Sequence, residues 1–312
     1  MTVRIVIALG GNALLARGES PDAGIQLKHV RVAAEAIAPL AASHDVLICH
    51  GNGPQVGLLA LESETDPALN CPYPLDDLVA QTQGMIGYWL AQALRNAGVG
   101  KPIVAMVTQT LVDSADPAFS APTKFVGPGY PRERARELAD VHGWTIAADG
   151  GRWRRVVASP EPHRIIEQHS ITALLDSGIV VIAGGGGGAP VAEDTAGALR
   201  GVEAVVDKDY VAALLGIAVG AQRLMVLTDV AGVMINYGTP QSAQLTEVDL
   251  HELANMQFPA GSMGPKTEAC RRFVSATGKP ATIGALDDAP ALFAGTAGTT
   301  IRLRREPSRN RN

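Results

Sequence analysis

Five short runs of consecutive apolar residues recur along the chain, and most of them end in glycine or a polar residue. The runs cover residues 3–9, 46–49, 103–107, 179–183 and 224–227. None of them alternates apolar with polar positions, as a strand with one solvated face does. Strands that are apolar on both faces are typical of a parallel sheet covered by helices on its two sides. The runs therefore predict a parallel sheet at the centre of the fold.

Longer amphipathic stretches separate these runs and predict the covering helices. They occupy residues 25–42, 75–97, 163–177, 208–219, 246–255 and 265–277. Alternation of strands with helices predicts an α/β fold, a three-layer αβα sandwich. The length of 312 residues allows one large α/β domain or two smaller ones.

Residues 113–162 interrupt this alternation. The segment holds a stretch rich in proline and glycine at 121–131, a charged stretch that reads as a helix, and Gly150-Gly151 followed by Trp153 among three arginines. It is too long for a simple connection between strands and too patterned for a linker. It predicts an inserted subdomain, or lid, over one edge of the sheet.

Glycines and polar residues follow several of the predicted strands. The sequences are Gly10-Gly11-Asn12, His50-Gly51-Asn52-Gly53, five glycines at 184–188 and Thr228-Asp229. Ligands of open α/β sheets bind at the carboxyl ends of the strands, and glycine loops let backbone N–H groups approach an anion. Tight turns alone would explain any single loop, but explain four of them poorly. We interpret His50 as a hydrogen-bonded structural residue, with a catalytic role as the alternative.

Two lysines occur at predicted helix starts. Lys208 lies between Asp207 and Asp209, and Lys266 follows Gly264-Pro265. A lysine near the amino end of a helix opposes the helix dipole, but it suits a side chain that reaches a bound phosphate. An ordinary surface ion pair is the alternative for Lys208. The sequence contains no G-x-x-x-x-G-K-[ST] motif and no G-x-G-x-x-G after the first strand. These residues indicate an α/β enzyme that handles phosphate, and they do not identify the acceptor.

The net charge and the cysteine content indicate which partners and which cellular compartment to expect for this activity. The formal net charge of −5 argues against binding nucleic acid, which requires a basic surface. The cysteines are three in number and lack a C-x-x-C pair, which predicts reduced thiols and no zinc site. The apolar run after Met1 is too short for a signal peptide, and no later run approaches a membrane span. We therefore expect a cytoplasmic protein that contacts neither nucleic acid nor membrane.

The motifs together resemble the amino acid kinase superfamily and, within it, the carbamate kinase family. Matching segments run in order across nearly the whole chain, at residues 10–13, 51–57, 81–88, 122–128, 184–191, 206–209, 227–230 and 262–269. The segments at 81–88 and 122–128 are similar to motifs specific to carbamate kinases. The glycine loops and Thr228-Asp229-Val230 are shared with related kinases.

This resemblance implies a single domain over residues 1–312, with a mainly parallel sheet of about eight strands and a protruding subdomain at 113–162. It implies a homodimer that uses Mg²⁺ with ATP or ADP. The implied reaction is reversible phosphoryl transfer between ATP and carbamate, used to make ATP from carbamoyl phosphate in the breakdown of arginine or another nitrogen compound. The alternative is a non-catalytic or divergent paralogue that binds another small anion.

The resemblance also implies roles for individual residues. Lys124 holds the carbamoyl group, Lys208 and Lys266 stabilise the transferring phosphoryl group, and Asp209 orients these lysines. The substrate and phosphate cradle is formed by Gly10, Gly11, Asn12, Gly51, Asn52 and Gly53. The nucleotide is bordered by Gly185, Gly186, Asp207, Thr228, Asp229, Val233 and Met263. The sequence does not identify metal ligands.

The family pattern is altered at residues 240–244, at Gly129 and at two positions just after Thr228-Asp229. Ala231 stands where an acidic residue is expected, and Met234 stands where an aromatic residue is expected. Both follow Thr228-Asp229, so they affect the nucleotide side. They leave the non-catalytic alternative open.

Overall fold

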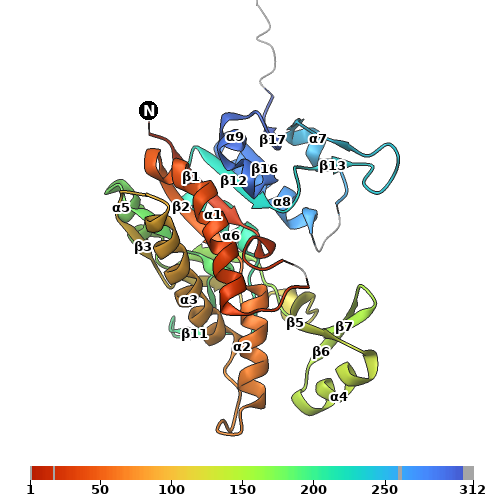
Figure 1. Ribbon diagram of the computed structural model, residues 1–312. Coiled ribbons are helices and arrows are strands. Elements are labelled where there is room, and N and C mark those ends of the chain that lie inside the picture. The colour runs from red at the N-terminus through yellow and green to blue at the C-terminus, as the bar shows by residue number, and fades with distance from the viewer. Residues whose placement is uncertain (1, 17, 259–261, 305–312) are drawn as a thin grey trace, which may run out of the picture.

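A mainly parallel sheet of eight strands forms the centre of the molecule (Figure 1). The structure, a computed structural model, describes residues 2–16, 18–258 and 262–304. In spatial order the strands are β15 (Glu247–Asp249), β17 (Thr299–Arg302), β16 (Ala281–Ala285), β12 (Arg223–Thr228), β1 (Arg4–Leu9), β2 (Asp45–His50), β9 (Val180–Ile182) and β3 (Ile103–Ala105). All neighbours run parallel except β16 and β17. The predicted parallel sheet is confirmed.

Helices cover both faces of this sheet. One face packs against α1 (Ala23–Ser43), α3 (Leu75–Asn96) and α9 (Ala289–Ala294), and the other against α5 (Gln168–Asp176), α6 (Lys208–Ala218) and α8 (Met263–Thr277). Along β1, Ile5 and Ile7 enter the first core, whereas Val6 and Ala8 enter the second. All four side chains are fully buried, which explains why this strand shows no apolar–polar alternation. The predicted three-layer sandwich is confirmed.

Two of the predicted helices begin later than the sequence suggested. Residues 162–165 form strand β8 (Pro162–Ile165), which pairs antiparallel with β4 (Gln109–Val112), and α5 begins only at Gln168. Residues 247–249 form β15, and helix α7 (Leu250–Ala254) begins after a capping box made by Asp249 and Glu252. In both cases pairing with a strand distant in the sequence outweighs local helical periodicity.

The sequence pattern also missed several short elements. Besides β16, β17 and α9, these include strands β10 (Ala189–Glu193) and β11 (Leu199–Gly201). The longer helix α2 (Gly53–Thr65), which has a proline at its second position, was also not among the predicted helices. A second sheet has the order β11-β10-β4-β8. The remaining short elements are the hairpin β13 (Met234–Ile235) with β14 (Ala243–Gln244), and the 3-10 turns η1 (Gly11–Ala13), η2 (Pro117–Phe119), η3 (Gly185–Gly187) and η4 (Leu286–Asp288).

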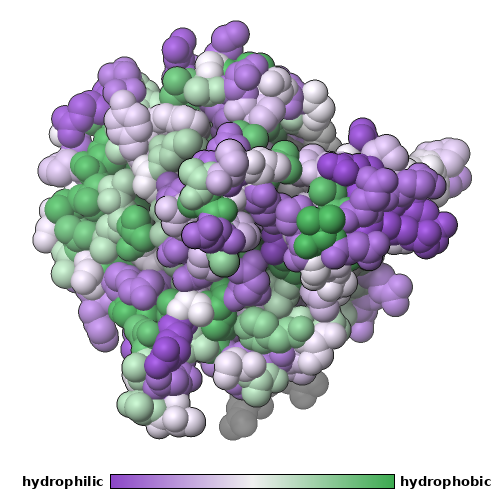
Figure 2. Space-filling view, turned by 90° about the horizontal axis from the view of Figure 1, so that it is seen from below, coloured by the Kyte–Doolittle hydropathy of each residue, from purple (hydrophilic) through white to green (hydrophobic). Residues whose placement is uncertain are grey.

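A small lobe projects from the body at the lower right of Figure 1. It consists of β5 (Lys124–Tyr130), α4 (Arg132–His142), β6 (Thr145–Asp149) and β7 (Arg152–Val157), with the strand order β5-β7-β6. Figure 2 shows mainly hydrophilic side chains over the projecting lobe, as expected for a unit with little core of its own. The lobe lies within the predicted insertion at 113–162. Its action as a lid stays a prediction.

No helix in the described part of the chain is long and apolar enough to cross a membrane. Cys49, Cys71 and Cys270 are all free thiols.

Candidate active site

The loops after β1 and β2 meet at the carboxyl edge of the central sheet. A Cβ atom added to Gly51 would lie 3.0 Å from the backbone N and Cα of Gly11, and 3.4 Å from Cε of Lys208. A Cβ atom added to Gly10 would lie 3.3 Å from the carbonyl oxygen of Leu227, at the end of β12. Asn12 lies in the same turn as Gly11. The glycines therefore allow backbone segments and a lysine side chain to pack closely at this edge.

Asp209 holds two lysines at the amino end of α6. Its Oδ1 lies 2.5 Å from Nζ of Lys208, and its Oδ2 lies 3.1 Å from Nζ of Lys266. Lys266 comes from the first turn of α8, so the aspartate joins two helices that both begin at this edge. The predicted grouping of Lys208, Asp209 and Lys266 is present in the structure.

Burial and mutual attraction shift the pKa values of all three groups. Burial alone would raise the pKa of Asp209, but the charges and hydrogen bonds of the two lysines hold it well below its usual range. Burial lowers the pKa of Lys208, and Asp209 only partly offsets it. Burial also opposes the charge of Lys266, but the attraction of Asp209 outweighs it and raises the pKa of Lys266. The carboxylate therefore stays ionised between two lysines.

Asp207 links the projecting lobe to the same helix. Its Oδ2 lies 2.6 Å from Nζ of Lys124, the first residue of β5. Its Oδ1 accepts a hydrogen bond of 2.9 Å from the backbone N–H of Asp209 and so caps α6. Three lysines thus gather with Asp207 and Asp209 at one helix start, and Asp229 also attracts Lys266. Each ammonium group carries three N–H donors, more than its aspartate uses, so the cluster can also bind an anion.

The five-glycine run packs against polar side chains of the second loop. Gly185 leaves room for the ring of His50, and Gly186, at φ +64°, leaves room for the amide of Asn52. Asn52 in turn donates a hydrogen bond of 2.9 Å to Oγ1 of Thr82. A side chain at either glycine would collide with these groups, so packing requires glycine at both positions.

His50 is buried and neutral. Its Nδ1 donates to the carbonyl oxygen of Gly51 at 3.0 Å, and burial lowers its pKa to about 4. A ring held in this way is a poor proton carrier near pH 7. The geometry agrees with the structural interpretation of this histidine.

Sequence reasoning assigned no role to the polar residues on the buried face of α3. Gln83 Oε1 accepts hydrogen bonds from the backbone N–H and the hydroxyl of Thr108, and its Nε2 donates to the Thr108 carbonyl oxygen. Thr108 Oγ1 accepts a hydrogen bond from the N–H of Gly184. Through these hydrogen bonds, Thr82 and Gln83 hold the loops that contain Asn52 and Gly184 in place. The sequence does indicate such a role, because both polar residues occupy positions on the apolar face of an amphipathic helix.

Several of the residues predicted to border the nucleotide lie at the carboxyl end of β12 and at the start of α8. Thr228 Oγ1 donates to Oδ1 of Asp229 at 3.1 Å. Val233 is fully buried, and its N–H donates to Oγ1 of Thr299 at 2.8 Å. Met263 is the first residue of α8. Gly261, just before the matching segment at 262–269, lies outside the described residues.

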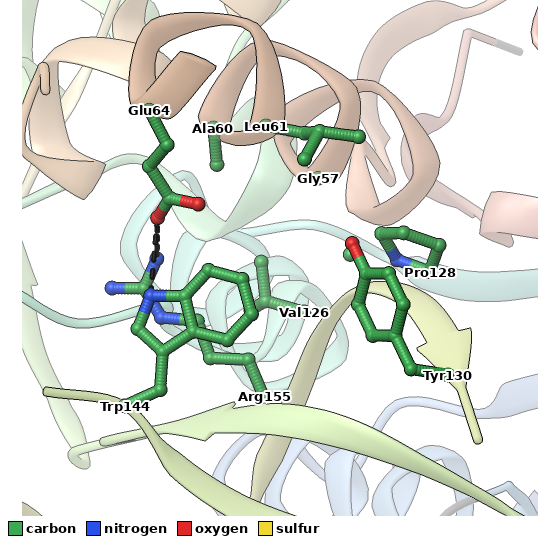
Figure 3. Close-up of a pocket in the computed structure, with 10 residues that line it drawn as sticks. Gly57, Ala60, Leu61, Glu64, Val126, Pro128, Tyr130, Trp144 and Arg155 are labelled. Atoms are coloured by element: carbon green, nitrogen blue, oxygen red, sulfur yellow. Dashed lines mark hydrogen bonds and ion pairs between the residues drawn. The ribbon is translucent and has the colours of Figure 1, made fainter. Parts of the chain in front are cut away.

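The base of the projecting lobe rests on α2 (Figure 3). Glu64 of α2 accepts hydrogen bonds from Arg155 at 2.9 Å and from Nε1 of Trp144 at 3.2 Å. A cavity of about 10 Å³, close to the volume that one water requires, lies beside them. Among the described residues the buried hydroxyl of Tyr130 has no hydrogen-bond partner. This joint fixes how β5, and with it Lys124, meets the body.

Within the described residues, no three side chains of the His, Cys, Asp and Glu types form a group able to hold a metal ion. The two aspartates of the site are already bonded to lysines.

Residues 3–285 match the model of the amino acid kinase family. The chain therefore belongs to this family, and the eight-stranded sheet and the glycine loops are those of an amino acid kinase fold.

The relatives narrow this assignment to the carbamate kinase branch of the family. The chain is 49% identical to a carbamate kinase of Rhizobium meliloti (strain 1021) over 302 residues, which cover 96% of this chain and 93% of that protein. It is 47% identical to a carbamate kinase of Escherichia coli (strain K12), with coverage of 96% and 99%. The structure of a carbamate kinase from Giardia lamblia bound to AMP-PNP matches with a TM-score of 0.89 at 38% identity, and covers 97% of this chain and 99% of that one.

Proposed function

We propose that this protein is a carbamate kinase, which transfers a phosphoryl group reversibly between ATP and carbamate. The observation that carries the proposal is the cluster of Lys124, Lys208 and Lys266 held by two aspartates at the start of α6. The chain is 49% and 47% identical to two carbamate kinases over 96% of its length, which supports the choice of carbamate as acceptor.

The roles of the lysines follow from the charge that develops during the reaction. Phosphoryl transfer needs reactants in line and positive charge around the equatorial oxygens, with little covalent chemistry from the protein. Lys208 and Lys266 supply that charge from two helix starts, and Asp209 keeps both in place. Lys124 approaches from the lobe and holds the carbamoyl group. The backbone around Gly10, Gly11, Gly51 and Gly53 cradles the phosphate, together with Asn12 and Asn52.

ATP or ADP binds as its Mg²⁺ complex on the side of β12 and α8. The Giardia lamblia relative was solved with AMP-PNP, an ATP analogue, which supports a nucleotide site in this fold. We place the nucleotide beside Thr228, Asp229 and Met263, with Gly185, Gly186, Asp207 and Val233 in the surrounding shell. Mg²⁺ is held mainly by phosphate oxygens and water.

The proposed physiological direction is ATP synthesis. Carbamoyl phosphate is a mixed anhydride, so transfer of its phosphoryl group to ADP is favourable. The protein would act as a cytoplasmic homodimer in the breakdown of arginine or another nitrogen compound. Ala231 and Met234 favour one second candidate, a divergent paralogue that binds an anion without turning it over.

The test is ATP formation from ADP, Mg²⁺ and carbamoyl phosphate, read through a coupled enzyme. Lys208→Ala and Lys266→Ala should each reduce kcat by roughly a hundredfold or more, the scale of losing one contact to transition-state charge. Lys124→Ala should chiefly raise KM for carbamoyl phosphate. Near-normal turnover in Lys266→Ala would refute the assignment. A folded parent protein that forms no ATP would support the paralogue, and a screen of acceptors with ATP would follow.

A further inference from the structure

Asp207 uses its two carboxylate oxygens for two separate tasks. Oδ1 accepts from the backbone N–H of Asp209 at 2.9 Å, which caps α6 and fixes the orientation of the carboxylate. Oδ2 faces the lobe and bonds to Nζ of Lys124 at 2.6 Å. Only 11% of the Asp207 side chain is exposed, whereas 36% of the Lys124 side chain is exposed. The rigid partner of this ion pair is therefore the aspartate, and the flexible partner is the lysine.

Lys124 belongs to a different structural unit from the other two lysines. It begins β5 of the lobe, whereas Lys208 and Lys266 begin helices of the body. The base of the lobe is anchored through Val126 and Val157, which pack with Val56 of α2 in a separate small core. The ion pair to Asp207 spans 83 positions of the chain and connects the lobe to the helix that carries Lys208.

We propose that Asp207 is a positioning residue, which holds Lys124 of the lobe at the start of α6 so that its ammonium group is in place before the anionic substrate binds. This inference rests on the proposed function, because it concerns the lysine assigned to the carbamoyl group. It differs from the expectation that Asp207 contacts the nucleotide.

An ammonium group can serve Asp207 and a substrate at the same time. It carries three N–H donors, and the single oxygen of Asp207 uses one of them. A free lysine side chain has many accessible rotamers, and binding would otherwise have to overcome the entropy lost when one of them is fixed. Holding the lysine in advance reduces this cost, which is the general benefit of preorganisation. The two remaining donors of Lys124 are available to an incoming oxygen.

Repulsion between Asp207 and the anionic substrate is the opposing effect. The carboxylate is paired with Lys124, lies at the positive end of the α6 dipole and has Lys208 and Lys266 nearby, so its own negative charge is largely compensated. Preorganisation therefore outweighs repulsion, and removal of the Asp207 charge should weaken substrate binding.

Asp207→Asn tests the proposal, because asparagine caps a helix about as well as aspartate but cannot form the ion pair. We expect KM for carbamoyl phosphate to rise about tenfold, with a smaller change in kcat and an almost unchanged melting temperature. Asp249→Asn is the matched control, since Asp249 caps α7 with the same side-chain geometry and lies outside the lysine cluster. This control should leave KM unchanged.

A double variant shows whether Asp207 acts through Lys124. In a Lys124→Met background, Asp207→Asn should have no further effect on KM. An equal rise in both backgrounds, or a rise below twofold in the single variant, would overturn the proposal.

A separate measurement distinguishes failure of this inference from failure of the proposed reaction. Hydrogen exchange of the ligand-free protein requires no substrate, so it remains valid if no ATP is formed. Asp207→Asn should speed exchange of the β5 amides relative to the parent and to Asp249→Asn. Unchanged exchange in β5 would contradict the positioning role whatever the reaction is.

Discussion

Substitution of Gly57 by alanine should move the lobe that carries Lys124. Gly57 lies inside α2, and a Cβ atom there would stand 2.5 Å from Cα and 2.6 Å from N of Gly127 in β5. Gly127 adopts φ +73°, a conformation that favours glycine. Both contacted atoms belong to the backbone, so no side chain can rotate away. Either α2 or β5 must shift.

The expected change in stability is the difference between two effects. Alanine is favoured over glycine inside a helix by about 1 kcal/mol. Carbon atoms pack at about 3.5–4.0 Å, so the added methyl would enter about 1 Å too far. Overpacking of this kind costs about 1–3 kcal/mol. Gly57→Ala should therefore be about neutral to 2 kcal/mol destabilising, in spite of the gain in helix propensity.

Gly84→Ala is the control for propensity alone. Gly84 lies in the interior of α3, is exposed, and a Cβ atom there would meet nothing within 4 Å. Urea unfolding of the two variants should place Gly57→Ala below Gly84→Ala by about 1–3 kcal/mol, the cost of the clash. Gly57→Ala should also raise KM for carbamoyl phosphate, because β5 begins with Lys124. If the two variants are equally stable and have parental kinetics, the close packing of α2 on β5 has no energetic weight and the reasoning fails.

Three further predictions concern buried charge. Asp209→Asn leaves two buried lysines without their carboxylate and should destabilise the fold by about 3–5 kcal/mol, measured by calorimetry. Folded His50, with a pKa of about 4, stays unprotonated between pH 6.5 and 4, whereas the histidine of the unfolded chain binds a proton there. The free energy of unfolding should therefore fall by about 3 kcal/mol as the pH is lowered from 6.5 to 4. Urea titrations of His50→Asn should lack this pH dependence. Arg155→Met removes the ion-pair partner of the buried Glu64 carboxylate, which keeps only the hydrogen bond from Trp144, and should cost about 3 kcal/mol by urea unfolding. Glu64→Gln should restore part of this loss in the double variant.

The sequence predicted the elements that are long and locally patterned. Strands such as β1 and helices such as α3 were found because their apolar periods are complete within a single segment. β17 was not found, because its four residues form a strand only by pairing with β15 and β16. The same limit applies to β8, which lies inside a stretch of helical periodicity.

In the same way, some features of the site could be predicted from the sequence and others could not. The glycine loops and the lysines at helix starts could be recognised from local chemistry, whereas their grouping was implied only by the resemblance to a family. Lys124 and Asp207 are separated by 83 positions, and no local pattern encodes their contact. The support that Gln83 gives to Thr108 likewise depends on the packing of α3 against the second sheet.

The lysine cluster shows why buried charge is retained at this edge of the sheet. Asp207 and Asp209 are two residues apart at one helix start, where the helix dipole stabilises negative charge, and each binds lysine from another part of the chain. Exact charge balance would serve stability best, because an unpaired buried ion is costly. Asp209 is shared by Lys208 and Lys266, so the pairing of lysines with aspartates is not one to one. In the proposed reaction an anionic substrate would add negative charge beside these lysines, so part of the cost of burying them would be recovered when phosphate binds and when charge develops on the transferring group.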